Sequence, residues 1–187
     1  MSDHKTKSGD IGEKVVRDVL VSLKSEKIIS GFISSRNLYY YGKNFQIDFV
    51  VFIPKIGLLL IEVKNWKGEV KVTYKDKWTQ VVGEEISEFQ NGSNQVLRTS
   101  NLLLQILEKM GKNIYPIRPL VVFSNDKVKL LKGVKNLAPQ TSVIKVDMIR
   151  DWIKKNSEND IFYDIPLSTF TKIKDIIIGY SKEYDGR

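Results

Sequence analysis

Three charged side chains interrupt two apolar runs between Gln46 and Gly68, and they are Asp48, Glu62 and Lys64. An ionised side chain inside a buried strand costs several kcal/mol unless it is paired or binds a metal. Two carboxylates that converge from neighbouring strands would form an oxygen site suited to a hard divalent cation, which positions a water molecule and lowers its pKa. A neighbouring lysine can orient that water or stabilise charge on a phosphate. These residue types therefore indicate metal-dependent hydrolysis.

The rest of the composition excludes several other chemistries. The 187 residues include no cysteine and one histidine, His4, in a polar N-terminal segment. Disulfides, thiolate zinc sites and cysteine nucleophiles are excluded, and histidine-based triads and zinc sites are disfavoured. No stretch approaches the roughly 20 apolar residues of a membrane span, and the N-terminal segment lacks the apolar core of a signal peptide. We therefore expect a cytoplasmic protein that does not bind membranes.

The charge balance points to a polyanionic partner. Thirty Lys and Arg residues against 22 Asp and Glu residues give a net charge of +8, and the isoelectric point is about 9.4. Such a balance favours nucleic acid first and an anionic membrane second. Charge alone does not decide between them and a protein that is merely lysine-rich.

The periodicity of apolar residues predicts the elements that position the three charged residues. A helix with apolar residues at helical spacing is expected over Ile11–Lys24, after a possible cap at Ser8–Asp10. Runs rich in β-branched and aromatic residues then predict an antiparallel meander of three strands. These strands are Gly31–Tyr41, Phe45–Ile53 and Leu58–Lys64.

The following segments predict a helix and a buried strand. Apolar spacing gives a helix over Asn94–Lys109, which Gln95 opens, and Ile117–Phe123 is nearly continuous in apolar residues, as in a strand covered on both faces. A strand reached through a helix is usually parallel to an earlier one. Beyond Ser124 the sequence predicts a strand (Val143–Val146), a helix (Met148–Lys155), a loop (Asn156–Asp160) and a last helix (Phe170–Tyr180).

The register between the second and third strands decides whether the acids meet. Glu62 and Lys64 share one face of their strand because side chains alternate. A four-residue loop over Pro54–Gly57 would place Asp48 opposite Val63, on the other face. We therefore predict an odd-length loop or a β-bulge near the acids, an irregularity that is common beside active sites.

A basic hairpin is expected between Asn65 and Gly83. Its lysines, Lys67, Lys71, Lys75 and Lys77, alternate with the aromatic residues Trp66, Tyr74 and Trp78. Such a pattern suits nucleic-acid binding by charge and stacking. A solvated hairpin flanked by core tryptophans fits the same pattern, and both interpretations stay open.

The ordered set of residues resembles the nuclease-related domain family, NERD, within the wider PD-(D/E)XK nuclease superfamily. The resemblance rests on Gly12-Glu13, Gln46-Ile47-Asp48, Ile61-Glu62-Val63-Lys64-Asn65, Gly68 and Gln95, and it covers roughly residues 9–123. Asp48 is preceded by isoleucine rather than by the proline of the superfamily's name, which is usual for NERD. Asn91 is followed by Gly92, where the family often has proline.

The resemblance implies an α/β fold with the αβββαβ core of that superfamily, a mixed sheet flanked by helices. It also implies that Asp48, Glu62 and the Val63 carbonyl bind Mg²⁺, for which Mn²⁺ could substitute. Lys64 would assist the water or the transition state, Glu13 would be an accessory acid, and Gln95 would orient Lys64 or the phosphate. We expect residues 1–124 to form this core and residues 125–187 to form a small α/β extension packed on it.

Three hypotheses follow for the function. The first is a metal-dependent nuclease that hydrolyses phosphodiester bonds, with DNA ahead of RNA as substrate. The second is a non-catalytic module that binds nucleic acid or regulates another protein while retaining the nuclease fold. The third makes the ion bridge of Lys64 with Asp48 or Glu62 purely structural. The oligomeric state stays open, a homodimer included.

Overall fold

The structure is a computed structural model of the chain, and it describes residues 2–109, 111, 116–159 and 165–185. Fifteen elements follow one another along these residues. They are α1 (Ser2–Ser25), β1 (Gly31–Tyr40), β2 (Lys43–Ile53), β3 (Gly57–Lys64), β4 (Gly68–Val72), β5 (Lys77–Val82), β6 (Glu85–Gln90), α2 (Gly92–Lys109), β7 (Ile117–Phe123), β8 (Val128–Lys132), η1 (Lys135–Leu137), β9 (Ser142–Lys145), η2 (Val146–Met148), α3 (Ile149–Asn159) and α4 (Leu167–Asp185).

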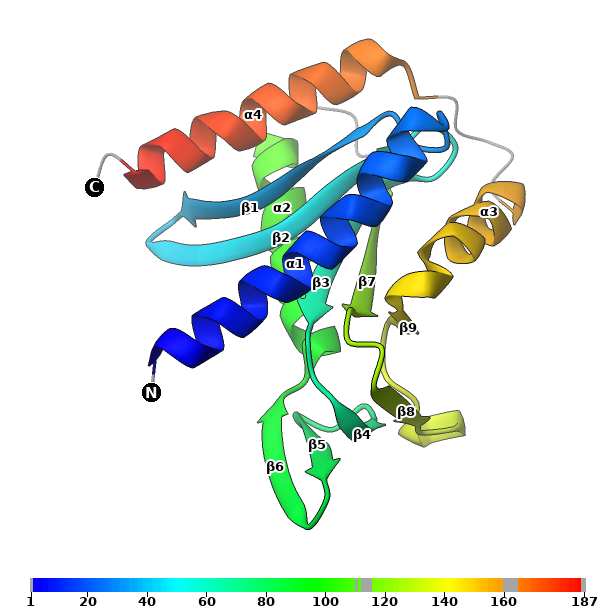
Figure 1. Cartoon of the computed structure of the whole chain (residues 1–187). Helices are drawn as coiled ribbons and strands as arrows, with labels where there is room; N and C mark the ends of the chain where they lie inside the picture. The colour runs from blue at the N-terminus through cyan, green and yellow to red at the C-terminus, as the bar shows by residue number, and fades with distance from the viewer. Residues whose placement is uncertain (1, 110, 112–115, 160–164, 186–187) are drawn as a thin grey trace.

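The strands form two sheets (Figure 1). The larger sheet has the order β1-β2-β3-β7-β9. Its first three strands are the predicted antiparallel meander, whereas β7 runs parallel to β3 and β9 runs parallel to β7. The smaller sheet has the order β6-β5-β4-β8 and is inserted between β3 and α2, apart from β8. The larger sheet with α1 and α2 confirms the predicted αβββαβ core and mixed α/β class.

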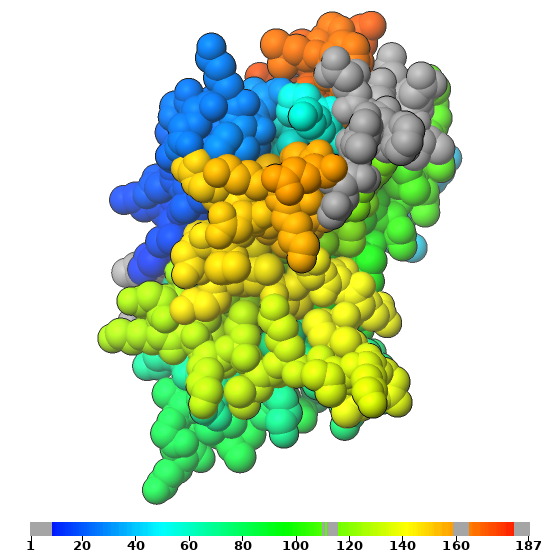
Figure 2. All heavy atoms as spheres, turned by 90° about the vertical axis from the view of Figure 1, so that its right-hand side faces the viewer, coloured from blue at the N-terminus to red at the C-terminus, as the bar shows by residue number. Residues whose placement is uncertain are grey.

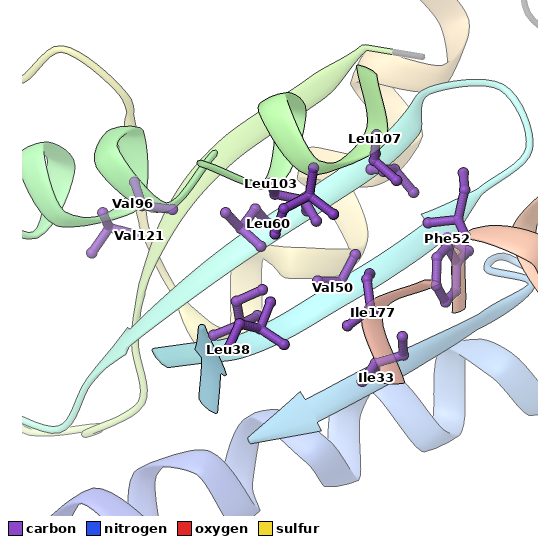
Figure 3. Packing of buried hydrophobic residues seen from close by; sticks show 14 of the residues in the cluster. Ile33, Leu38, Val50, Phe52, Leu60, Val96, Leu103, Leu107, Val121 and Ile177 are labelled. Carbon is purple, nitrogen blue, oxygen red and sulfur yellow. The ribbon is translucent and has the colours of Figure 1, made fainter. Parts of the chain in front are cut away.

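Helices cover both faces of the larger sheet because its central strands are apolar on both faces. Figure 3 shows Val50 and Leu60 packed against Leu103 of α2 and Ile177 of α4. The alternate residues of the same strands face the other way and contact α1 and α3. Side chains of the smaller sheet, among them Trp78, join the cluster on the α2 side. This arrangement places the C-terminal end of β3 beside the smaller sheet.

The loop between β2 and β3 has the predicted odd length. Ile53 pairs with Gly57, so three residues form the loop, and the ladder continues to the pair of Phe49 with Ile61. Gly57 has φ +101°, and a Cβ atom there would lie 2.6 Å from the Pro116 carbonyl oxygen. Since only glycine fits this position, the turn and its register are fixed together.

Several local predictions were wrong. The helix α1 begins at Ser2, so Ser8–Asp10 lies inside it and does not cap it. Residues 156–159 continue α3 where a loop was predicted, and Asp160 lies outside the described residues. The strands β6 and β8 were not predicted. Most residues of β6 are exposed, and it is recruited by pairing with β5 rather than by burial of its own side chains.

The C-terminal residues complete both sheets. β8 pairs with β4 of the smaller sheet, and β9 pairs with β7 of the larger one. Figure 2 shows the segment from β8 to α3 as a continuous band down this side of the molecule. α3 packs on the α1 side, whereas α4 packs along β1 on the other side. Among the described helices, none combines the length and the apolar character that a membrane span requires.

Candidate active site

Asp48 lies on β2 where the ladder to β3 ends. The last pair of this ladder is Phe49 with Ile61, and the same register carried one residue further would set Asp48 opposite Glu62 on one face of the two strands. The backbone N–H of Val63 donates a hydrogen bond to Asp48 Oδ2 over 2.8 Å. The carboxylate therefore takes the place of a backbone acceptor at the point where the two strands separate.

Lys64 is held by two acceptors from different elements. Its Nζ donates to Glu62 Oε1 and to Gln95 Oε1, each over 2.7 Å. The side chains of Lys64 and Glu62 are only 12% and 15% exposed, so the pair is largely shielded from water. Gln95 reaches Lys64 from the first turn of α2. The family resemblance implied that Gln95 would orient either Lys64 or the phosphate, and that role stays a prediction.

Asn91 fixes the start of α2. Its Oδ1 accepts hydrogen bonds from the backbone N–H groups of Ser93 and Asn94, over 2.7 and 3.3 Å, which is the geometry of a helix N-cap. Its Nδ2 donates to the carbonyls of Thr73 and Lys75, over 3.1 and 2.6 Å. The buried side chain of Asn91 thereby joins the β4–β5 turn to the helix that carries Gln95.

Glu13 reaches the site from α1. A Cβ atom at Gly12 would lie 2.8 Å from Asn65 Cβ and 2.7 Å from Ser124 Oγ, so the helix passes directly against the ends of β3 and β7. Glu13 accepts a hydrogen bond from the Ser35 hydroxyl. Ser35 has φ +48° and interrupts the pairing of β1 with β2 beside Asp48. The glycine therefore permits the approach that brings Glu13 near the two strand acids.

The electrostatics of the site centre on Asp48. Burial, followed by the negative charge of Glu62, raises the pKa of Asp48 from 3.8 to about 7. The negative charge of Glu13 acts in the same direction, whereas the Val63 N–H and the Lys64 ammonium lower the pKa. The Val63 N–H and the Lys64 ammonium thus do not offset the burial of Asp48 and the negative charges of the two neighbouring carboxylates. An added cation would favour the ionised carboxylate.

The family model for NERD, described as the nuclease-related domain, matches residues 8–124. This match spans more than half of the 187 residues. The chain belongs to the NERD family. The resemblance inferred from the sequence is thereby confirmed, and NERD carries the PD-(D/E)XK type of fold that the larger sheet displays. No curated protein and no solved structure matched the chain in the corresponding comparisons.

The donor atoms of this NERD domain fit a hard divalent cation. Asp48 and Glu62 supply two carboxylates, and a bound cation would offset the burial and the negative charge of Glu62 that raise the pKa of Asp48. The Lys64 carbonyl accepts from Ser124 N–H on the β7 side, so strand alternation turns the Val63 carbonyl towards β2 and its acid. Among the described residues no three His, Cys, Asp or Glu side chains form a metal-binding group by themselves. Water and substrate oxygens would complete the coordination.

A groove runs past the end of β3 in this NERD domain. It has a volume of about 540 Å³ and is lined by Gly9, Val63, Lys64, Asn65, Trp66, Lys67, Gln80, Phe89 and Asn125. Trp66 packs on Phe89 and Phe123, with ring centroids 4.7 and 5.7 Å apart, and Lys64 Nζ lies 5.8 Å from the Trp66 ring centre. Trp66 and Lys67 therefore share a surface with Lys64.

The other predicted nucleic-acid contacts lie elsewhere. Lys71, Lys75 and Lys77 line a second pocket on the outer face of the smaller sheet. Trp78 is fully buried, and its Nε1 donates to the Thr73 carbonyl over 2.7 Å. The interpretation of Trp78 as a core residue was thus correct. The structure divides the four predicted lysines between two surfaces.

Sequence reasoning assigned no role to two residues of the site, Ser35 and Asn91. Ser35 contacts Glu13, and its role depends on a backbone conformation that no local pattern announces. Asn91 does have a sequence signal, because Asn followed by Gly and Ser before an apolar periodic run is typical of a helix start. Its hydrogen bonds to the distant β4–β5 turn could not be inferred from that signal.

Proposed function

We propose that this NERD domain is a Mg²⁺-dependent nuclease that hydrolyses phosphodiester bonds, with DNA as its preferred substrate. The observation that supports the proposal most directly is the convergence of Asp48, Glu62 and Lys64 at the end of β3. Glu13 and Gln95 join them from flanking helices. A nuclease-related role follows from the family, whereas the metal, the substrate and the turnover belong to this proposal.

Each residue has a distinct task in the proposed reaction. Asp48, Glu62 and the Val63 carbonyl would hold Mg²⁺, which supplies charge neutralisation and activation of a water molecule when bound. Lys64 would donate hydrogen bonds to the attacking water or to a phosphate oxygen, and thereby stabilise the developing negative charge. Gln95 keeps the ammonium of Lys64 beside Glu62.

Glu13 has an accessory task in this scheme. Its negative charge already raises the pKa of Asp48, and its hydrogen bond to Ser35 keeps it near the strand acids. A carboxylate beside two metal-binding acids can orient a water molecule without binding the cation directly. Glu13 is therefore proposed as an accessory acid that orients water, and not as a direct ligand of Mg²⁺.

The two other hypotheses make different use of the same contacts. A structural ion bridge between Glu62 and Lys64 is present at 2.7 Å, but it leaves unexplained the partly buried Asp48, whose pKa is raised to about 7. A non-catalytic module that binds nucleic acid would use the groove without turnover. Against it stands the presence of every acid, lysine and glutamine that the reaction would need.

The choice of nucleic acid rests on charge. The net charge of +8 suits a polyphosphate partner, and Lys67 extends the basic surface of the groove next to Lys64. DNA stands ahead of RNA by the family resemblance alone. A cytoplasmic location fits the lack of cysteine and stays an expectation, as does a possible homodimer.

The proposal is tested by cleavage assays on labelled substrates. Duplex, single-stranded and branched DNA and single-stranded RNA would each be incubated with purified protein in EDTA, Ca²⁺, Mg²⁺ or Mn²⁺. We expect cleavage of DNA in Mg²⁺ and Mn²⁺ and none in EDTA. Binding without cleavage under every ion would favour the non-catalytic module, and cleavage that persists in EDTA would contradict the proposed chemistry.

A further inference from the structure

A basic pocket lies on the outer face of the smaller sheet, away from the groove of Lys64. It has a volume of about 440 Å³, and its lining comprises Lys71, Thr73, Lys75, Lys77, Thr79, Leu131, Lys132, Gly133 and Leu137. We propose that this pocket binds the phosphate backbone of nucleic acid, as a second contact surface that shares no lining residue with the groove of Lys64. The inference rests on the proposed function, since it takes the same polymer as partner.

Strand register places the pocket on the face that the core does not cover. Lys71 of β4 lies directly opposite Thr79 of β5 and Leu131 of β8, so the three side chains share one face. The alternate residues Val70 and Val72 are fully buried on the other face. The smaller sheet therefore separates this pocket from the hydrophobic cluster.

The charges on this outer face change from one end to the other. At one end, Lys129 of β8 pairs with its direct neighbour Glu69 of β4 over 2.6 Å. Two residues further along β4, Lys71 has a threonine and a leucine as its cross-strand neighbours. Between β4 and β8, the charge of Lys129 is thus neutralised by Glu69, whereas the charge of Lys71 has no acidic cross-strand neighbour.

The pocket as a whole is cationic. Among the described residues, none of the pocket's lining residues is acidic, and no ion pair engages Lys71, Lys75 or Lys132. Lys77 pairs with Glu88 over 3.3 Å, but both side chains are more than half exposed, so this pair is weak. Like charges on neighbouring positions repel, and a polyanion that spans them would relieve the repulsion.

One wall of the pocket is formed before any ligand binds. Gly133 N–H donates to the Val72 carbonyl over 2.9 Å, and a Cβ atom at Gly133 would lie 2.0 Å from the Leu137 carbonyl oxygen. The chain is thus folded tightly back on itself after β8. Leu131 and Leu137 remain 37% and 45% exposed and offer apolar surface to sugars or bases. A preformed pocket lowers the ordering cost of binding.

A charge-matched pair of variants tests the inference. One protein carries Lys71→Gln, Lys75→Gln and Lys132→Gln, and its control carries Lys55→Gln, Lys155→Gln and Lys172→Gln. The control lysines are exposed, and Lys55 lies in the β2–β3 loop, at the far end of β3 from Lys64 (Figure 1). Affinity for a fluorescent DNA duplex would be measured by anisotropy in EDTA, over a series of salt concentrations.

We expect the pocket variant to bind DNA at least about ten times more weakly than the control variant. Its salt dependence should fall by about two to three units of slope, because each lost phosphate contact removes about 0.9. Equal affinity and slope in the two variants would overturn the inference while leaving the proposed function intact. If the unmodified protein neither binds nor cleaves DNA, the proposed function fails and this inference fails with it.

Discussion

Lys64 Nζ and Gln95 Oε1 lie 2.7 Å apart, and this contact joins the end of β3 to the first turn of α2. The lysine has Glu62 as its other acceptor. One carboxylate and one amide oxygen therefore fix the ammonium between two elements that are far apart in the chain. The position of Lys64 relative to the strand acids depends on both.

Replacement of Gln95 should reduce turnover more than binding. In Gln95→Leu the ammonium loses its second acceptor and can move, and we expect the DNA cleavage kcat to fall about 10- to 100-fold with a smaller change in KM. Gln95→Glu keeps an acceptor oxygen and should restore part of the rate. Gln105→Leu, an exposed position on the same helix, is the control. A uniform loss in all three variants would refute a positioning role.

The raised pKa of Asp48 predicts how stability changes with pH. An ordinary aspartate titrates near 3.8 and Asp48 in the fold near 7, so between these values the folded protein binds more protons than the unfolded chain. The metal-free protein should therefore lose stability as pH rises from about 4 to about 7. Asp48→Asn removes this loss, and the variant should be the more stable protein at pH 8, on the order of 2 to 4 kcal/mol.

Urea unfolding in EDTA at pH 5, 6, 7 and 8 measures that difference. The gap between Asp48→Asn and the unmodified protein should widen over this range. Asp18→Asn, at an exposed position of α1, controls for the loss of one negative charge. A gap that stays constant with pH would show that Asp48 titrates as it does in the unfolded chain.

The close approach of α1 to the strand ends can be tested at Gly12. A Cβ atom there would lie 2.7 Å from Ser124 Oγ, so Gly12→Ala should destabilise the fold by about 1 to 3 kcal/mol through overpacking. Gly9→Ala, where nothing lies within 4 Å, should stabilise the helix by up to about 1 kcal/mol. Chemical denaturation of both variants gives the comparison. If both are stabilised, α1 is not held against Asn65 as described.

Much of this fold could be predicted because its signals are local. Continuous apolar runs identified β2, β3 and β7, and the requirement that Asp48 share a face with Glu62 predicted the odd-length loop. β6 and β8 escaped prediction because they form by pairing with β5 and β4, and their own side chains are largely exposed. A strand that forms mainly by hydrogen bonding to another strand has no strong apolar pattern in its own sequence.

The site likewise contains residues that the sequence reveals and contacts that it does not. Asp48, Glu62 and Lys64 stand out because charged residues are unusual in apolar strands. The hydrogen bonds that Asn91 and Ser35 make to the β4–β5 turn and to Glu13 depend on how separate segments meet. The split of the basic hairpin into two surfaces likewise depends on which face of β4 and β5 the core covers.

The most direct test of the central claim is the rate at which Glu62→Gln cleaves duplex DNA in Mg²⁺. The variant removes one carboxylate charge and retains the shape of the side chain, and circular dichroism and DNA affinity verify its fold. We predict a loss of at least about 100-fold relative to the unmodified protein, because Glu62 would hold the cation that neutralises charge and activates the water, with similar losses in Asp48→Asn and Lys64→Met. Unchanged cleavage by the folded Glu62→Gln protein would contradict the proposed active site.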